Sequence, residues 1–227
     1  MNPALLITRP EADGSKLIQE LRAMALHPRV ILAPVMEIRS VAFELPDRAF
    51  DFLVLTSRHA VAAAQSYQGL PALCVGEATA QAAREAGFET PSVFANAEAL
   101  LAGVAPYAGQ RALYLHGRHT RGRLAERLNS AEIATEDRVV YDQVACDWPP
   151  QICEEIMAQS ALILPLYSPR SARLVAENLA GFTGKLTLVG LSEACLEGWT
   201  GPVPVTTVVA ARPDGAAMKM AIASQLP

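Results

Sequence analysis

Short apolar runs alternate with longer amphipathic stretches along most of this 227-residue chain. The runs have the length and the Val, Ile and Leu content of buried strands, whereas the stretches between them repeat apolar residues at helical spacing. Strands are predicted at residues 4–8, 30–33, 52–56, 72–75, 92–95, 112–115, 161–165, 186–189 and 206–210. Helices are predicted at 14–25, 79–86, 124–128, 152–158 and 172–179, among others. The alternation predicts an α/β fold with parallel sheets.

Two further segments, residues 35–41 and 138–144, alternate apolar and polar positions, as strands with a wet face do. Each lies between a stretch that completes one α/β unit and a stretch that begins the next, so we interpret them as a pair of crossing linkers. The predicted organisation is a discontinuous α/β domain 1 (1–36 and 145–227), an inserted α/β domain 2 (42–137) and linker strands (37–41 and 138–144).

A faint internal repeat accompanies this division. Residues 52–61 and 74–79 in the first half, and 162–171 and 188–193 in the second, both follow the order strand, Ser, helix, strand, Gly, helix. Two parallel α/β units can show this order through fold alone, so the repeat leaves common origin open.

Composition narrows the class of protein. The chain is 51% hydrophobic and 19% charged, which indicates packed cores rather than disorder. A net charge of -4 argues against a nucleic-acid-binding surface, although a local basic loop stays open. The sequence contains no run of about 20 apolar residues, the length needed to cross a membrane. The N-terminal apolar stretch is predicted to be a strand rather than a signal peptide. The four cysteines form no Cys-x-x-Cys pair, and Cys74 and Cys195 are expected to be buried thiols. This use of cysteine fits a reducing compartment, so a cytoplasmic location is expected.

Common catalytic signatures are missing from the sequence. There is no dinucleotide-binding glycine motif, no P-loop and no nucleophile elbow. His116 and His119 lie in a donor-rich stretch, residues 116–123, which we assign to a strand-to-helix loop, but no carboxylate or thiol completes a zinc site there. We expect an anion-handling or solvated loop, and a reaction that depends on positioning and electrostatics.

The candidate chemistry lies where strands end. Ser57 and Ser168 are each predicted to cap the next helix, and Pro169 suits the first helical position. Residues 76–79 and 190–192 offer similar turns. Capping serines need no ligand, but helix N-termini at the carboxyl edge of a parallel sheet also attract anions. Because the turns are mirrored in both halves, we expect a cleft for a large polyanionic ligand, with nearby guanidinium groups from Arg9, Arg58 and Arg170.

The motifs at the strand ends and in the second linker resemble those of the uroporphyrinogen-III synthase family. The resemblance runs from about Leu5 to Met220, and the ordered set of motifs carries it rather than any one of them. The set is Thr8-Arg9-Pro10, Pro34, Thr56-Ser57-Arg58, Val75-Gly76-Glu77-Ala78-Thr79-Ala80, Val140-Tyr141, Tyr167-Ser168-Pro169 and Val189-Gly190.

The resemblance implies two flavodoxin-like α/β domains joined by a two-stranded linker. It implies a hydro-lyase that uses no cofactor and no metal and closes hydroxymethylbilane, which carries eight carboxylates, with inversion of ring D. A monomer is expected, with no nucleic-acid or membrane partner, and a transient contact with hydroxymethylbilane synthase is left open. The alternatives are a non-catalytic two-lobed ligand-binding or regulatory module and, third, a flavodoxin-like nucleotide binder.

Carried over by position, Tyr141 is the side chain that assists departure of the hydroxyl, although an interface aromatic would occupy the same place. The positions implied for substrate binding are Thr8, Arg9, Ser57, Arg58, Thr79, Ser168, Arg170 and Ser192. Two departures from the family stand out. Glu193 replaces a common Thr, so we expect Glu193 to face solvent and Ser192 to supply the hydroxyl. No glycine occurs between Met24 and Val30.

Overall fold

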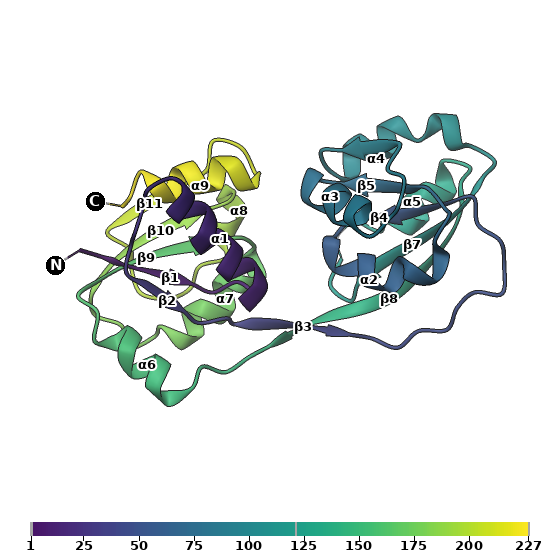
Figure 1. Cartoon of the computed structure of the whole chain (residues 1–227). Coiled ribbons are helices and arrows are strands. Elements are labelled where there is room, and N and C mark those ends of the chain that lie inside the picture. Colours follow the sequence, from purple (N-terminus) through teal and green to yellow (C-terminus); the bar gives the residue numbers. More distant parts are fainter. Residues whose placement is uncertain (1, 121, 227) are drawn as a thin grey trace. The chain divides into compact units, whose positions relative to one another are not determined.

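The computed structural model describes residues 2–120 and 122–226. Packing divides the chain into two units, Met1–Glu37 with Val144–Pro227 (unit 1) and Ile38–Gln143 (unit 2). Each unit has its own sheet, as Figure 1 shows, and its own hydrophobic cores. The segments predicted as linker strands, residues 37–41 and 138–144, overlap two strands of the sheet in unit 2.

Unit 1 contains a five-stranded parallel sheet in the order β11-β10-β9-β1-β2. The strands are β1 (Ala4–Ile7), β2 (Val30–Leu32), β9 (Ala161–Leu166), β10 (Lys185–Gly190) and β11 (Thr206–Val209). Counted along the chain this is the 2-1-3-4-5 order of flavodoxin-like sheets, and the order reverses between β1 and β9. The helices are α1 (Glu11–Ala23), α6 (Pro150–Met157), α7 (Pro169–Asn178), α8 (Glu193–Glu197) and α9 (Gly215–Ala223).

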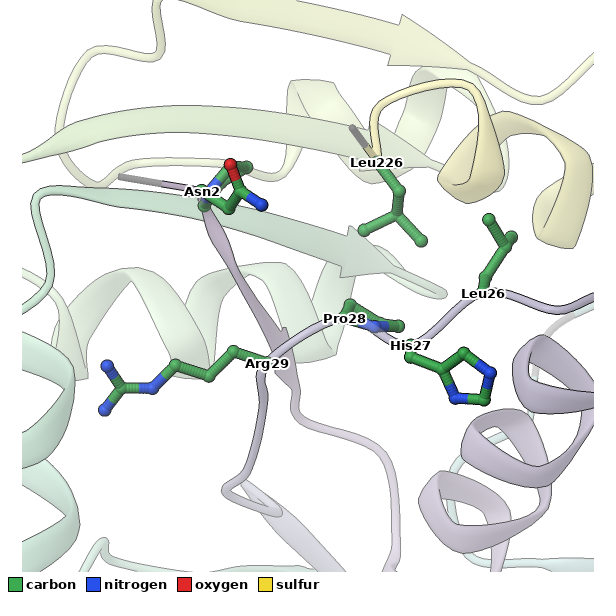
Figure 2. Close-up of a pocket in the computed structure, with 7 residues that line it drawn as sticks. Asn2, Leu26, His27, Pro28, Arg29 and Leu226 are labelled. Carbon is green, nitrogen blue, oxygen red and sulfur yellow. The ribbon is translucent and has the colours of Figure 1, made fainter.

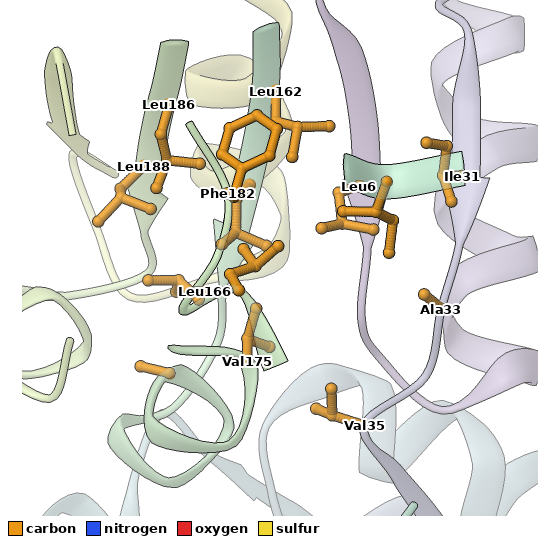
Figure 3. Packing of buried hydrophobic residues seen from close by; sticks show 14 of the residues in the cluster. Leu6, Ile31, Ala33, Val35, Leu162, Leu166, Val175, Phe182, Leu186 and Leu188 are labelled. Carbon is orange, nitrogen blue, oxygen red and sulfur yellow. The ribbon is translucent and has the colours of Figure 1, made fainter. Parts of the chain in front are cut away.

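Both faces of the inner strands β1 and β9 are buried, which explains why these two strands are continuous apolar runs. Along β1, Leu6 packs into a core shared with α6 and α7, whereas Leu5 and Ile7 pack into a second core shared with α1 and α9. Figure 3 shows the first core, in which Phe182 and Val175 lie against the strand residues. Successive strand residues thus face opposite sides of the sheet.

Unit 2 contains a six-stranded sheet in the order β3-β8-β7-β4-β5-β6. The strands are β3 (Met36–Ser40), β4 (Phe52–Leu55), β5 (Ala72–Val75), β6 (Ser92–Phe94), β7 (Arg111–Gly117) and β8 (Ala134–Ala145). The five strands from β4 to β8 pair in parallel in the order 3-2-1-4-5, the other common doubly wound order. Here the order reverses between β4 and β7.

The helices of unit 2 are short, and they again cover two cores. They are α2 (Val61–Ala64), α3 (Glu77–Glu85), α4 (Ala97–Gly103) and α5 (Leu124–Ser130), with 3-10 turns η1 (Arg58–Ala60), η2 (Gln65–Tyr67) and η3 (Ala105–Tyr107). In β4, Leu53 and Leu55 pack with α2 and α3, whereas Phe52 and Val54 pack with α4 and α5.

The predicted α/β class with parallel sheets is confirmed, and all nine predicted strands form. Several boundaries differ from the predicted ones by a few residues, and one of these differences affects the candidate site. His116, which the sequence analysis assigns to a loop, lies in β7, because that strand continues to Gly117. Arg121, part of the same predicted loop, lies outside the described residues. Within the described ranges, no helix is long and apolar enough to cross a membrane.

Candidate active site

In unit 1 the candidate site lies where β1 and β9 end side by side. Parallel sheets leave a crevice at such a reversal of strand order. Arg9 follows β1 and Tyr167 follows β9, and the Arg9 guanidinium carbon lies 4.1 Å from the centroid of the Tyr167 ring. Arg9 also pairs with Asp13, at 3.1 Å between Nη2 and Oδ2. Burial raises the pKa of the Tyr167 phenol, and the nearby Arg9 opposes that shift. Arg9 is therefore held on two sides, and Thr8 beside it is buried.

Ser168 caps α7, as the sequence predicts. Its Oγ accepts the Ser171 backbone N–H at 3.0 Å, and the Ser171 Oγ accepts the Ser168 backbone N–H at 3.2 Å, which completes a capping box. Pro169 is the first helical residue, also as predicted. The oxygen of Ser168 is thus already engaged in holding the helix start.

Arg170 lies in the first turn of α7, and one nitrogen of its guanidinium group is in an unusual environment. Its Nη1 is buried and finds no hydrogen-bond acceptor among the described residues. Buried donors in native proteins nearly always have a partner. An anionic oxygen of a ligand could supply one, so Arg170 has the strongest structural support among the predicted guanidinium groups.

The third turn of unit 1 follows β10. Ser192 is the N-cap of α8, and its side chain accepts no backbone N–H. Its Oγ instead lies 3.5 Å from the Cys195 Sγ. Glu193 is exposed, so the expectation that this carboxylate faces solvent is confirmed. The hydroxyl of Ser192 is therefore less committed to the fold than that of Ser168.

In unit 2 the corresponding reversal lies between β4 and β7. After β4, the Ser57 Oγ accepts the His59 backbone N–H at 3.3 Å, which confirms the predicted cap on η1. The hydroxyls of Thr56 and Tyr114 lie 3.2 Å apart. Burial raises the pKa of Tyr114, and this hydrogen bond opposes the shift. Arg58 is half-buried in the same turn.

Tyr141 lies beside this turn. It belongs to β8 and pairs with Gly117 of β7, and its ring meets the ring of His59 edge-on at 5.7 Å between centroids. Only 9% of Tyr141 is exposed. Topology thus brings Tyr141 to the turn that carries Ser57 and Arg58, at the carboxyl end of β4.

Thr79 lies one turn along α3, whose N-cap is Gly76. Gly76 has a φ of 81°, a left-handed value that suits glycine. Thr79 is 5% exposed, and its backbone N–H donates to the Gly76 carbonyl. Because α3 packs against η1, Thr79 belongs to the same edge of the sheet as Ser57.

The histidines of the predicted loop do have carboxylate neighbours, which corrects the sequence analysis. His116 Nε2 lies 2.9 Å from Asp137 Oδ2, and His119 Nε2 lies 3.2 Å from Asp142 Oδ1. Both aspartates come from β8, more than twenty residues along the chain. Desolvation acts to raise the pKa of Asp142, but hydrogen bonds from Arg118 and the Gln143 backbone, together with the charges of Arg118 and His119, hold that pKa below its ordinary value. Across the described ranges, no group of three or more His, Cys, Asp or Glu could hold a metal ion.

The predicted residues therefore gather at two separate sheet edges. Thr8, Arg9, Ser168, Arg170 and Ser192 lie in unit 1, and Ser57, Arg58, Thr79 and Tyr141 lie in unit 2. Sequence reasoning did not place several neighbours at these edges, although it named Tyr167 in a motif and His116 and Gly117 in a predicted loop. Asp13 could have been found, because it follows Arg9 by four residues on a helix. The others, Tyr167, His116, Gly117 and Asp137, required strand pairing.

A pocket elsewhere in unit 1 does not belong to this site. It has a volume of about 140 Å³ and lies near Asn2 and His27, at the amino ends of β1 and β2. In Figure 2 the Arg29 side chain extends away from Leu26 and Leu226. Arg29 pairs instead with Glu155 at 3.3 Å. The pocket is thus at the opposite end of the strands from Arg9.

Comparisons with known proteins agree with one another. A protein-family profile described as "Uroporphyrinogen-III synthase HemD" matches residues 15–200. Among solved structures, the uroporphyrinogen-III synthetase of Helicobacter pylori 26695 is 16% identical, with 99% of each chain covered and a TM-score of 0.69. A mutant uroporphyrinogen III synthase of Thermus thermophilus is 15% identical, with 98% of each chain covered and a TM-score of 0.52. No curated protein matches. At these identities the structural likeness establishes the fold, and the family profile establishes the family.

Proposed function

Because the chain belongs to the uroporphyrinogen-III synthase family, we propose that it cyclises hydroxymethylbilane to uroporphyrinogen III and that Tyr141 assists the first step. The family places the chain among the lyases of tetrapyrrole biosynthesis, enzymes that act on a small molecule. In this proposal, the side chains at the two sheet edges bind the bilane and assist its ionisation.

The proposed chemistry begins with ionisation of the substrate. The C–O bond of the terminal hydroxymethyl group breaks, and hydroxide leaves with the bonding electrons. The substituted α-carbon of ring D then attacks the resulting electrophilic carbon and gives a spiro intermediate. That intermediate fragments and closes again with ring D inverted. A proton is lost as the pyrrole becomes aromatic again, so the net loss is one water molecule. No step needs an oxidant or reductant.

Tyr141 suits the ionisation step because of its surroundings. The observation that carries the proposal is the contact between the rings of Tyr141, on β8, and His59. His59 lies in the turn that follows β4 and that Ser57 caps. A phenol is a weak acid at neutral pH. It can still donate a hydrogen bond to a departing hydroxide, and an interaction that strengthens as charge develops lowers the barrier.

The eight carboxylates of the bilane need donors, and both sheet edges supply them. We propose that Arg170 binds one carboxylate through its buried Nη1, with Arg9 and Arg58 as further guanidinium donors. Guanidinium groups bind carboxylates in a fixed two-point geometry. The hydroxyl of Ser192 accepts no backbone N–H in its cap, whereas the hydroxyls of Ser57 and Ser168 each accept one. Thr8 and Thr79 complete the set, and they are its most buried members.

We propose further that the enzyme acts as a cytoplasmic monomer. The bilane closes by itself to the wrong isomer in water, so a transient contact with hydroxymethylbilane synthase would shorten its exposure. Co-sedimentation of the two enzymes during turnover, compared with the synthase absent, tests that contact.

The direct test of the function is the isomer ratio of the product. Freshly made hydroxymethylbilane is incubated with the protein in the presence of a chelator and without added metal, the product is oxidised, and the porphyrin isomers are separated. Uncatalysed closure retains ring D and gives the type I isomer. We expect mainly type III product with the protein. A product no richer in type III than the protein-free control would refute the enzymatic function.

A further inference from the structure

The ring of Tyr141 rests on a position where only glycine fits. A β-carbon at residue 117 would lie 2.5 Å from Cε2 and from Cζ of the Tyr141 ring and 2.8 Å from its hydroxyl oxygen. These separations are shorter than any van der Waals contact between carbon atoms. Gly117 has no positive φ that would require glycine. The absence of a side chain at 117 is therefore explained by the ring, and not by the backbone.

A shift in strand register places the two residues opposite each other. His116 pairs with Val139, but the next residue, Gly117, pairs with Tyr141, so Val140 is an extra residue in β8. Such a bulge redirects the side chains beyond it. The Tyr141 carbonyl then accepts the Arg118 backbone N–H at 2.9 Å, which fixes the backbone just past the shift.

His116 bridges the shift. Its Nδ1 lies 2.8 Å from the Gly117 carbonyl oxygen, and its Nε2 lies 2.9 Å from the Asp137 carboxylate on β8. Both ring nitrogens face acceptors, so the two hydrogen bonds form together when both nitrogens carry a proton. The ring also stacks on Tyr114, with 4.5 Å between centroids, and His116 is 7% exposed. His116 thus ties the carbonyl of Gly117 to the neighbouring strand.

We propose that Gly117, His116 and Asp137 are positioning residues that hold the Tyr141 ring in its reactive orientation. Gly117 provides the surface on which the ring lies, and the His116–Asp137 pair keeps that surface in place against β8. The proposal rests on the proposed function, because it assumes that Tyr141 acts on the substrate. Misplacement of a reacting group by about 1 Å can lower a rate by orders of magnitude.

The geometry is tested without any activity measurement. The midpoint of thermal unfolding is compared for the wild type, Gly117→Ala, Tyr141→Ala and the double variant. We expect Gly117→Ala to lower the midpoint when Tyr141 is present and to leave it unchanged when Tyr141 is alanine, because the clash has gone. Gly181→Ala is the matched control, since a β-carbon there meets no described atom within 4 Å. An equal loss in both backgrounds would overturn the proposed contact.

The positioning role is tested by kinetics with Tyr141→Phe as the second background. Gly117→Ala should lower kcat about tenfold or more in the wild type, with KM changed less than about twofold. In Tyr141→Phe the ring remains but its hydroxyl is gone, so Gly117→Ala should add little. A full tenfold loss in that background would show that Gly117 acts by another route. If Tyr141→Phe alone keeps the wild-type kcat, the proposed role of Tyr141 fails instead, and the unfolding experiment still reports on the contact.

A second pair of variants tests the His116–Asp137 hydrogen bond and leaves Gly117 unchanged. Asp137→Asn keeps an oxygen and an amide that can pair with His116 Nε2, so kcat should stay within about twofold of wild type. Asp137→Leu has similar size and no polar group, so kcat should fall with little change in KM, and the fall should vanish in Tyr141→Phe. Equal kcat values for the two variants would overturn the part assigned to His116 and Asp137.

Discussion

The guanidinium of Arg9 stacks on the ring of Tyr167, with 4.1 Å between its central carbon and the ring centroid. The two residues are far apart in sequence, but each follows a strand, and these strands, β1 and β9, are parallel neighbours. The contact fixes Arg9 at the carboxyl edge of the sheet in unit 1. The ion pair with Asp13 completes the arrangement, since Asp13 is only 6% exposed.

The first prediction concerns this arrangement. Arg9→Ala removes a charged partner of a buried carboxylate, so we expect the free energy of unfolding in urea to fall by about 1–3 kcal/mol. Arg9→Lys keeps the charge but loses the planar guanidinium group that stacks on Tyr167. This variant should lose less stability than Arg9→Ala, and its KM should rise. Arg29→Ala is the control, because its pair with Glu155 is exposed and such pairs contribute about 0–1 kcal/mol. Equal losses for Arg9→Ala and Arg29→Ala would contradict the burial argument.

The second prediction concerns three helices that end in the same way. The residue after the C-cap has positive φ in α1 (Ala25, 60°), α3 (Gly87, 90°) and α5 (Glu132, 63°). In each case two backbone hydrogen bonds close the helix end, for example Leu26 N–H to the Leu21 carbonyl. This is the motif that favours glycine.

Ala25→Gly and Glu132→Gly should therefore raise the free energy of unfolding by about 1 kcal/mol each, because a side chain is strained in this conformation. Gly87→Ala should lower it by a similar amount. Urea unfolding of the three single variants checks the signs. A loss of stability in both glycine variants would mean that the flexibility glycine adds to the unfolded chain outweighs the strain.

These helix ends also show what the sequence could predict. Strands such as β4 were predictable because both faces are buried and every residue is apolar. Caps such as Ser168 were predictable because the signal is local. The end of α1 could not be predicted from the sequence, because Ala25 occupies the left-handed position at which a glycine would have marked the end of the helix. The register shift at Val140 was invisible, because it is defined by the pairing of β8 with β7 and not by the local sequence of β8. Pairing of His116 with Asp137 depends on that strand alignment.

The third prediction separates two capping serines. Ser168 takes part in a full capping box on α7, whereas Ser57 makes one bond of 3.3 Å on a three-residue turn. Ser168→Ala should lower the free energy of unfolding by about 1 kcal/mol, and Ser57→Ala by less than half of that. In both variants we expect a modest rise in KM and an unchanged kcat, since the backbone N–H groups remain. A large fall in kcat for Ser168→Ala would give its hydroxyl a role in the chemical step.

The fourth prediction concerns alkaline pH. Burial raises the pKa of the Cys74 thiol from 9.0 to about 11, with Arg84 opposing and Glu77 adding to the shift. The folded state therefore keeps a proton that the unfolded state releases above pH 9.0. The stability that Cys74 contributes should be constant below that pH and should be lost as pH rises toward 11.

Urea unfolding of the wild type and Cys74→Ala at several pH values isolates this contribution from other titrating groups. The difference in unfolding free energy between the two proteins should shrink above pH 9, although the absolute difference includes the loss of a buried sulfur. A difference that stays constant up to pH 10.5 would show that the thiol ionises no less readily in the folded protein than in the unfolded one.

The fifth prediction tests Tyr141 itself. Tyr141→Phe keeps the ring over Gly117 and its contact with His59 but removes the hydroxyl that we propose assists departure of hydroxide. An interaction made mainly in the transition state appears in kcat rather than in KM. Because the bilane ionises readily by itself, we expect kcat to fall about tenfold to a hundredfold, or about 1.4–2.7 kcal/mol of barrier. The midpoint of thermal unfolding should change little.

Tyr107→Phe is the matched control for this variant. It also removes a phenol hydroxyl, one that lies 3.2 Å from the Ser92 hydroxyl at the amino end of β6, at the opposite edge of the sheet from Ser57. Its kcat should equal that of the wild type. The two variants are compared by the initial rate of type III porphyrin formation from freshly made bilane, with the uncatalysed rate subtracted. A wild-type kcat in Tyr141→Phe would reduce Tyr141 to a packing residue, and the rate enhancement would then have to come from the folding and orientation of the bilane by its carboxylate contacts.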